Sequence, residues 1–150
     1  MFNYKSAKPI NILLVEDNPA DIRLTREVFK DGKINNILNV VMDGEEALLY
    51  LKKLDKYLSA ETPDLILLDL NLPKKDGREV LEEIKADYNL KLIPVIILTT
   101  SSAEKDIIAT YTHHANCYIM KPVDLGQFVS VIRCIEEFWL SIVKLPKKEE

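Results

Sequence analysis

A fivefold alternation of short apolar runs and longer helical patterns most constrains how this 150-residue chain can fold. The runs are rich in Leu, Ile and Val, and they predict strands at about residues 11–15, 37–42, 65–69, 94–98 and 117–120. Apolar residues then recur three and four positions apart, which predicts a helix after each strand. Such alternation is typical of a parallel sheet, and continuous apolar strands indicate that helices cover both of its faces. We therefore expect a doubly wound α/β domain with five parallel strands and five helices.

Capping residues mark the ends of several predicted helices. Asn18 followed by Pro19 is a favourable helix start, and Gly32 is a suitable terminator of the same helix. Asp124, with Gln127 three residues later, forms a capping-box pattern before the final helix. We expect the second helix to be long, over residues 44–58, because apolar residues continue at helical spacing through Ala47, Leu48, Leu51, Leu54 and Leu58.

Composition and charge exclude several classes of function. The length suits one domain over residues 1–150, with its core at about residues 10–142. The net charge of −4 provides no basic face for DNA or RNA, so we expect no nucleic-acid partner. No apolar run approaches the roughly 18–20 residues that span a bilayer, and the amino-terminal segment lacks the apolar core of a signal peptide. We expect a cytoplasmic protein without membrane association.

Chemically active side chains follow four of the five apolar runs. Glu16 and Asp17 follow the first run, Asp69 ends the third, Thr99 follows the fourth and Lys121 follows the fifth. Ligands of open α/β sheets bind outside the carboxyl ends of the strands. We therefore expect these side chains to form one site.

The residue types indicate phosphoryl chemistry assisted by a metal ion. Three clustered carboxylates repel one another and stay ionised together only around a shared cation. Oxygen ligands combined with phosphate favour Mg²⁺. Asp69 could then act as a nucleophile that forms an aspartyl phosphate, with Lys121 and Thr99 contacting the phosphoryl oxygens.

Each of these residues also has an ordinary explanation when taken alone. An aspartate after a strand is commonly a turn former or a helix cap, as Asp69 could be. Glu16 and Asp17 could begin an acidic loop, Thr99 could continue a strand, and Lys121 with Pro122 could be an exposed turn. Packing and turn formation do not, however, explain four such coincidences at four strand ends.

The motif set resembles the receiver domain of two-component response regulators. The matching positions are Glu16, Asp17, Asp69, Asn71, Pro73, Asp76, Gly77, Thr99, Tyr118, Lys121 and Pro122. The spacings are also typical of that family, with 30 residues from Asp69 to Thr99 and 22 from Thr99 to Lys121. The resemblance extends over about residues 10–142, which is nearly the whole chain.

The resemblance implies a fold, a reaction and a set of roles. The sheet would be flavodoxin-like, with strand order 2-1-3-4-5. Asp69 would accept a phosphoryl group from a sensor histidine kinase, in a self-catalysed transfer rather than as a turnover enzyme. Mg²⁺ would be held by the side chains of Glu16, Asp17 and Asp69 and by the backbone carbonyl of Asn71.

The resemblance assigns further residues to switching. Thr99 and Tyr118 occupy the family's switch positions, and Asn71 and Ser101 occupy positions that tune dephosphorylation. The peptide bond between Lys121 and Pro122 is expected to be cis.

Two features point to a subfamily and a mode of output. The long connection over residues 43–63 and the aromatic ending at residues 138–140 resemble the phytochrome-associated stand-alone receivers, which implies a phytochrome-like kinase. The chain ends eight residues after Ile142, so we expect no effector domain. The apolar stripe of the final helix is wider than the roughly 100° that covers a sheet. We therefore expect a homodimer through the final-helix face, with apolar residues at Leu125, Phe128, Val129, Val131, Ile132, Ile135, Phe138, Trp139, Ile142 and Val143.

Two alternatives remain open at this point. An aspartyl-phosphate phosphatase of the haloacid dehalogenase type also uses a strand-end Asp, Mg²⁺, Thr and Lys. That family places a second acid two residues after the nucleophile, where this chain has Asn71. The other alternative is a phosphate-independent interaction module.

Overall fold

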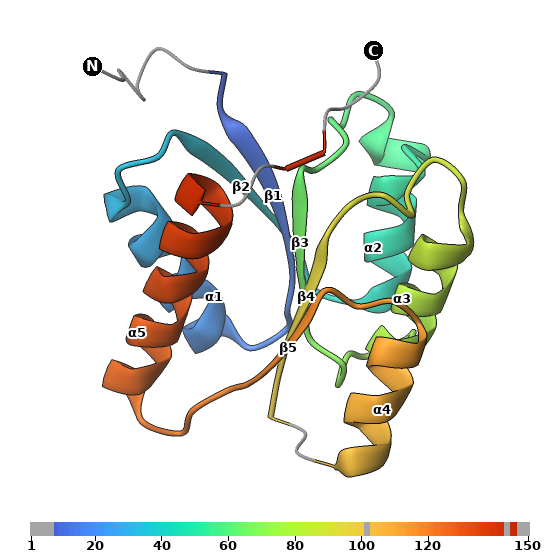
Figure 1. Cartoon of the computed structure of the whole chain (residues 1–150). Helices are drawn as coiled ribbons and strands as arrows, with labels where there is room; N and C mark the ends of the chain where they lie inside the picture. Colours follow the sequence, from blue (N-terminus) through green and yellow to red (C-terminus); the bar gives the residue numbers. More distant parts are fainter. Residues whose placement is uncertain (1–7, 101–102, 143–144, 147–150) are drawn as a thin grey trace.

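The computed structural model describes residues 8–100, 103–142 and 145–146. Five parallel strands form one sheet in the order β2-β1-β3-β4-β5 (Figure 1). The predicted flavodoxin-like strand order and doubly wound α/β class are confirmed. The strands are β1 (Ile10–Val15), β2 (Asn36–Val41), β3 (Leu65–Leu68), β4 (Val95–Thr99) and β5 (Cys117–Met120).

Helices cover both faces of the sheet (Figure 1). One face carries α1 (Pro19–Asp31) and α5 (Leu125–Ile135), and the other carries α2 (Gly44–Leu51), α3 (Gly77–Ala86) and α4 (Glu104–Thr112). The chain also forms a 3-10 turn, η2 (Asp55–Tyr57), and a π-helical continuation of α5, η3 (Glu136–Ile142). Among the described residues, no helix is both long and apolar enough to cross a lipid bilayer.

The sheet is buried between two apolar layers. Alternate residues of a strand point to opposite faces, so Leu13 packs under α2 and α3 while Ile12 packs under α1 and α5. Every residue of β3 has a relative exposure of 0%. Burial on both faces accounts for the continuous apolar runs in the sequence. It also makes the strands a rigid base for the residues at their carboxyl ends.

The second helix is shorter than its periodicity predicts. It ends at Leu51 instead of continuing through residues 44–58. Lys53 and Asp55 adopt positive φ angles of 57° and 54°, which are incompatible with a continuing right-handed helix. Leu58 stands at helical spacing but is 75% exposed. The apolar spacing beyond Leu51 therefore does not correspond to a buried helix face.

Candidate functional site

The carboxyl ends of four strands bring the predicted residues together at one edge of the sheet. Glu16 and Asp17 directly follow β1, Asp69 directly follows β3, Thr99 is the last residue of β4 and Lys121 directly follows β5. All except Asp17 are at least nine-tenths buried. Because these strands are parallel and paired side by side, their carboxyl ends place three acids, a hydroxyl and an ammonium in one region.

Three carboxylates form a cluster suited to a divalent cation. One oxygen from each of Glu16, Asp17 and Asp69 lies within 4.8 Å of the others. An all-oxygen donor set is what Mg²⁺ and Mn²⁺ prefer. The backbone amides of Asp17 and Asn18 hold the Glu16 carboxylate in place, because they donate to its Oε2 at 3.0 and 3.2 Å. The residues present fit a metal ion.

The ammonium of Lys121 is the positive charge of the site. Its side chain is 5% exposed, and Nζ donates to Glu16 Oε1 and, at 3.3 Å, to Asp69 Oδ2. The amide of Lys121 donates to the carbonyl oxygen of Thr99 at 2.7 Å, which fixes the backbone from which the side chain extends. Lys121 thus pairs with two of the carboxylates that would hold a metal ion.

Burial and the neighbouring charges have opposing effects on the pKa values of Glu16 and Lys121. Burial raises the pKa of Glu16 to about 7, while the hydrogen bond and charge of Lys121 oppose that rise. Burial lowers the pKa of Lys121, but its acidic partners outweigh burial, so the pKa of the ammonium lies above its ordinary value. Lys121 therefore remains charged at neutral pH, and the ionised form of Glu16 depends on a cation beside it.

The predicted switch and tuning residues surround Asp69. The Asn71 amide donates to Asp69 Oδ1 at 3.1 Å, and its side-chain nitrogen donates to Thr99 Oγ1 at 3.4 Å. Tyr118 is half-buried in β5, where its backbone amide donates to the hydroxyl oxygen of Tyr111 in α4 at 3.1 Å. β5 and α4 are therefore linked at the predicted aromatic switch position. The Ser101 position lies outside the described residues.

The segment after Asp69 is held tightly by the start of α3. The amide of Gly77 donates to the carbonyl oxygen of Leu70 at 2.9 Å, and Asp76 caps the helix by accepting from the amide of Arg78 at 3.0 Å. A Cβ atom at Gly77 would lie 2.6 Å from the Cα atom of Leu70 and would overlap the carbonyl oxygen of Asp69. Glycine is therefore required there by close backbone approach.

The expected cis peptide between Lys121 and Pro122 is wrong. The described residues contain no cis peptide bond, so this bond is trans. The trans form of an X–Pro bond is favoured by about 0.5–1 kcal/mol in the absence of other constraints. The Lys121 side chain reaches both Glu16 and Asp69 from the trans backbone, so aiming it into the site does not require the cis form.

One member of the site was missed by sequence reasoning. Asp21 Oδ2 accepts from Lys121 Nζ at 3.0 Å, across one hundred positions of sequence. The only local signal was an acid in the first turn of a helix, which the helix dipole explains without any partner.

The comparison with protein families identifies the family of the chain. The response regulator receiver domain matches residues 12–133. The chain belongs to this family. It is also 50% identical to response regulator Rcp1 of Synechocystis sp. over 142 residues, which are 95% of this chain and 97% of Rcp1.

Solved structures agree with this assignment. The crystal structure of the Mn²⁺-bound form of Rcp1 is similar with a TM-score of 0.91 and 50% identity, covering 93% of this chain and all of that one. The phosphorylated cyanobacterial phytochrome response regulator RcpA is similar with a TM-score of 0.91 and 52% identity, at the same coverage. The chain is a receiver of two-component signalling, and the phosphatase alternative is not favoured. Receivers bind a divalent metal ion at an acidic pocket, and this chain has a cluster of three acids at its candidate site.

Proposed function

We propose that this receiver takes a phosphoryl group from a sensor histidine kinase onto Asp69, with Mg²⁺ as the metal ion. One observation carries the assignment of the acceptor. Asp69 contacts the Lys121 ammonium through Oδ2 and accepts at Oδ1 from the backbone amide of Asn71, whose side chain in turn donates to Thr99. Of the other cluster acids, Asp17 is exposed, and Glu16 Oε2 already accepts from the backbone amides of Asp17 and Asn18.

The transfer is a single exchange of bonds at phosphorus. An oxygen of the Asp69 carboxylate attacks the phosphoryl group, a P–O bond forms as the P–N bond of phosphohistidine breaks, and the imidazole leaves with the bonding electron pair. Mg²⁺ held by the side chains of Glu16, Asp17 and Asp69 and the backbone carbonyl of Asn71 would neutralise charge on the phosphoryl oxygens. Water later attacks phosphorus, the P–O bond to Asp69 breaks, and inorganic phosphate leaves while the carboxylate is restored. The protein is consumed as a substrate in the first step and so acts as a switch rather than as a turnover enzyme.

Two residues then respond to the new charge. The Lys121 ammonium leaves Asp69 Oδ2 for a phosphoryl oxygen, and the Thr99 hydroxyl turns toward the same group. Tyr118 lies on the strand beside β4, and its amide contacts α4. Movement of Thr99 therefore changes the packing of Tyr118 and shifts the population of a two-state surface.

Phosphorylation of purified protein tests the acceptor. Incubation with acetyl phosphate and Mg²⁺ should add one phosphoryl group by mass spectrometry, and EDTA should prevent this. The Asp69→Asn variant should stay unmodified. The matched control is Asp31→Asn, which removes an exposed carboxylate at the end of α1 and should be modified like the wild type.

The alternatives make different predictions. Retention of the label in Asp69→Asn would assign the acceptor elsewhere. Failure of the wild type to bind Mg²⁺ or to take the group would favour the phosphate-independent interaction module.

We also propose a phytochrome-like kinase as the phosphoryl donor. The support is similarity to RcpA, a cyanobacterial phytochrome response regulator, and to the bacteriophytochrome response regulator RtBRR at 39% identity. The chain would act as one receiver domain, with its core at about residues 10–142, and the match to 97% of Rcp1 supports this. A cytoplasmic location suits the two free cysteines, Cys117 and Cys134. The net charge of −4 supports the absence of a nucleic-acid partner.

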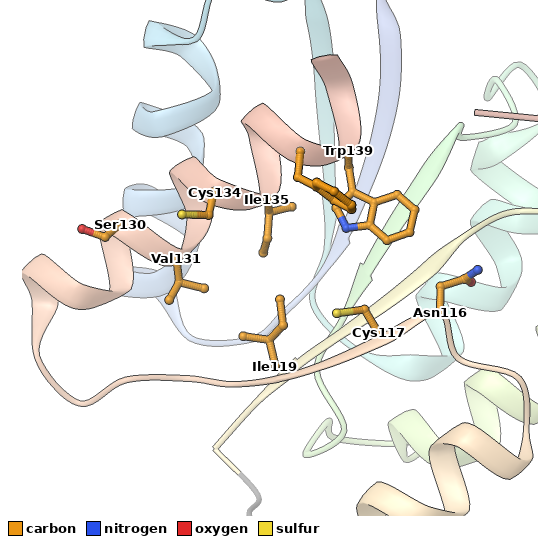
Figure 2. A pocket seen from close by; sticks show the side chains of 9 residues that line it. Asn116, Cys117, Ile119, Ser130, Val131, Cys134, Ile135 and Trp139 are labelled. Carbon is orange, nitrogen blue, oxygen red and sulfur yellow. The ribbon is translucent and has the colours of Figure 1, made fainter. Parts of the chain in front are cut away.

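The output surface that we propose is the α4–β5–α5 face, through which a second copy would bind. A groove of about 490 Å³ lies between β5 and α5 with η3, and Figure 2 shows Ile119 opposite Val131 and Ile135 within it. Phe138 is 49% exposed and packs edge-on against Trp139, with ring centroids 5.8 Å apart. Further exposed apolar residues on this face are Ile108, Tyr111, Met120 and Leu125.

Only part of the stripe on the final helix is free for such a contact. Phe128, Ile132 and Ile135 are buried against the sheet and α1. The side chain of Ile142, and Val143 as a whole, lie outside the described residues. The surface open to a second copy therefore consists of the groove and its exposed rim.

Sedimentation at several concentrations tests the dimer. The wild type should associate, more strongly with beryllofluoride and Mg²⁺, and Phe138→Asp or Val131→Asp should be monomeric. Leu92→Asp is the control, because it places a charge at a 70% exposed apolar residue that does not line the groove. A wild type that stays monomeric at high concentration with and without beryllofluoride would refute the dimer.

A further inference from the structure

The Lys121 ammonium has three carboxylate partners, and they are not equivalent. Two of them, Glu16 and Asp69, belong to the cluster that would hold a divalent cation. The third, Asp21, accepts from Nζ at 3.0 Å and is not a member of that cluster. A lysine and a metal ion therefore share two carboxylates, while one carboxylate is available to the lysine alone.

Asp21 is placed firmly enough to hold a cation. It lies in the first turn of α1, where the side chain of Asn18 accepts from the amides of Ala20 and Asp21 at 3.0 and 3.1 Å. The hydroxyl of Thr25 donates to the carbonyl oxygen of Asp21 at 2.7 Å. The amino-terminal end of a helix also favours a negative charge at this position. Its side chain is 20% exposed, which keeps it at the rim of the site.

Sharing creates a conflict whenever a metal ion binds. A divalent cation and an ammonium repel each other, and the two cannot bind the same carboxylate lone pairs at the same time. The backbone of Lys121 is fixed by its hydrogen bond to Thr99, so the ammonium can respond only by rotating its flexible side chain. Among its described partners, Asp21 is the one that the metal ion does not compete for.

We propose that Asp21 is a positioning residue that retains the Lys121 ammonium at the site while a divalent cation takes the carboxylates of Glu16 and Asp69. The inference rests on the proposed function, because it assumes that this cluster binds the metal ion used in phosphoryl transfer. Asp21 keeps the ammonium within reach of the incoming phosphoryl group and lowers the cost of moving it away from the metal ligands. It acts through Lys121 and contacts neither the metal ion nor the phosphoryl group.

Metal affinity in two backgrounds tests this role. We expect Asp21→Asn to weaken Mg²⁺ or Mn²⁺ binding about tenfold by isothermal titration, which corresponds to the loss of roughly 1.4 kcal/mol. In the Lys121→Met background the same substitution should change affinity by less than about twofold, because no ammonium remains to be held. Asp21→Glu should recover most of the affinity. Glu27→Gln, an equal loss of charge at an exposed position of α1, should have little effect in either background.

The outcomes separate this inference from the proposed function. An equal loss in both backgrounds would mean that Asp21 acts on the metal ion by its charge alone, and a larger loss in Lys121→Met would make it a direct ligand. Either result overturns the proposal, as does unchanged affinity in Asp21→Asn. A wild type that binds neither metal ion nor beryllofluoride would instead refute the proposed function. The affinity for beryllofluoride at saturating Mg²⁺ is a second measure. It should fall severalfold in Asp21→Asn and stay unchanged in Glu27→Gln. An equal fall in both variants would also overturn the proposal.

Discussion

Replacement of Arg78 should destabilise the protein by loosening α4 from α3. The guanidinium donates from Nε to Asp106 Oδ1 at 2.8 Å and from Nη2 to Asp106 Oδ2 at 2.7 Å. It also contacts Asp76, the cap of α3, at 2.8 Å. Among the described side chains of α4, only Asp106 and Thr110 are buried. The bidentate pair is therefore a principal attachment of a helix that otherwise buries little.

The size of the effect follows from burial and geometry. A hydrogen bond to a charged group contributes about 1.5–3 kcal/mol, and losing one partner of a fully buried pair costs about 3–5 kcal/mol. The Asp106 side chain is 10% exposed but Arg78 is 32% exposed, so solvent screens part of the interaction. We expect Arg78→Met to lower the free energy of unfolding by about 2–3 kcal/mol. For a chain of this length, this corresponds to a fall in Tm of about 5–10 °C.

Urea unfolding followed by circular dichroism measures this loss. Arg78→Lys should fall between the wild type and Arg78→Met, because lysine keeps the charge but cannot form the planar fork. Lys75→Met is the control next to the same helix, since the Lys75–Glu83 pair is more exposed and should contribute much less. The reasoning is refuted if Arg78→Met lies within about 0.5 kcal/mol of the wild type, or if it matches Lys75→Met.

Two further predictions concern the loop at Asp69 and the turn after α2. Gly77→Ala should lower the free energy of unfolding by about 1–3 kcal/mol, because its Cβ would overlap the Asp69 carbonyl. Phosphorylation of the variant should also be slower, and a free energy of unfolding in urea equal to that of the wild type would contradict the prediction. Burial and a hydrogen bond to Glu46 raise the pKa of Tyr57 to about 12. The folded state therefore binds this proton more tightly, and stability should fall between about pH 10 and pH 12 more steeply in the wild type than in Tyr57→Phe. Equal slopes in thermal melts across that range would argue against a native role for the Tyr57 hydrogen bond.

The strands and their end residues were predictable because burial and chemistry require particular residue types at those positions. A strand covered on both faces must be apolar throughout, and a polar residue such as Asp69 at its end then stands out. The length of α2 was not predictable from periodicity, since Leu58 has the spacing of a buried helix face but is exposed. The positive φ angles of Lys53 and Asp55 could not be predicted from the sequence, because neither residue is glycine.

Contacts between distant segments were the main omission. Asp21 and Lys121 are one hundred positions apart, and Arg78 and Asp106 are separated by 28. In each case the acidic residue has a sufficient local explanation on a helix, so the sequence contains no sign of its partner. The peptide between Lys121 and Pro122 was mispredicted for a related reason, because the isomer depends on the surrounding tertiary structure rather than on the two residues.

The position of β1 between β2 and β3 has a consequence for how the protein is made. Its register joins Ile10 to Asn36 on one side and Ile12 to Leu65 on the other. At about 5–20 residues per second, a ribosome adds the second partner roughly three to ten seconds after β1 itself. During that interval one edge of an apolar strand has no neighbour, which exposes the nascent chain to misassociation. Lys121 is added later still, so a growing chain carries the three acids for seconds before the ammonium that pairs with two of them.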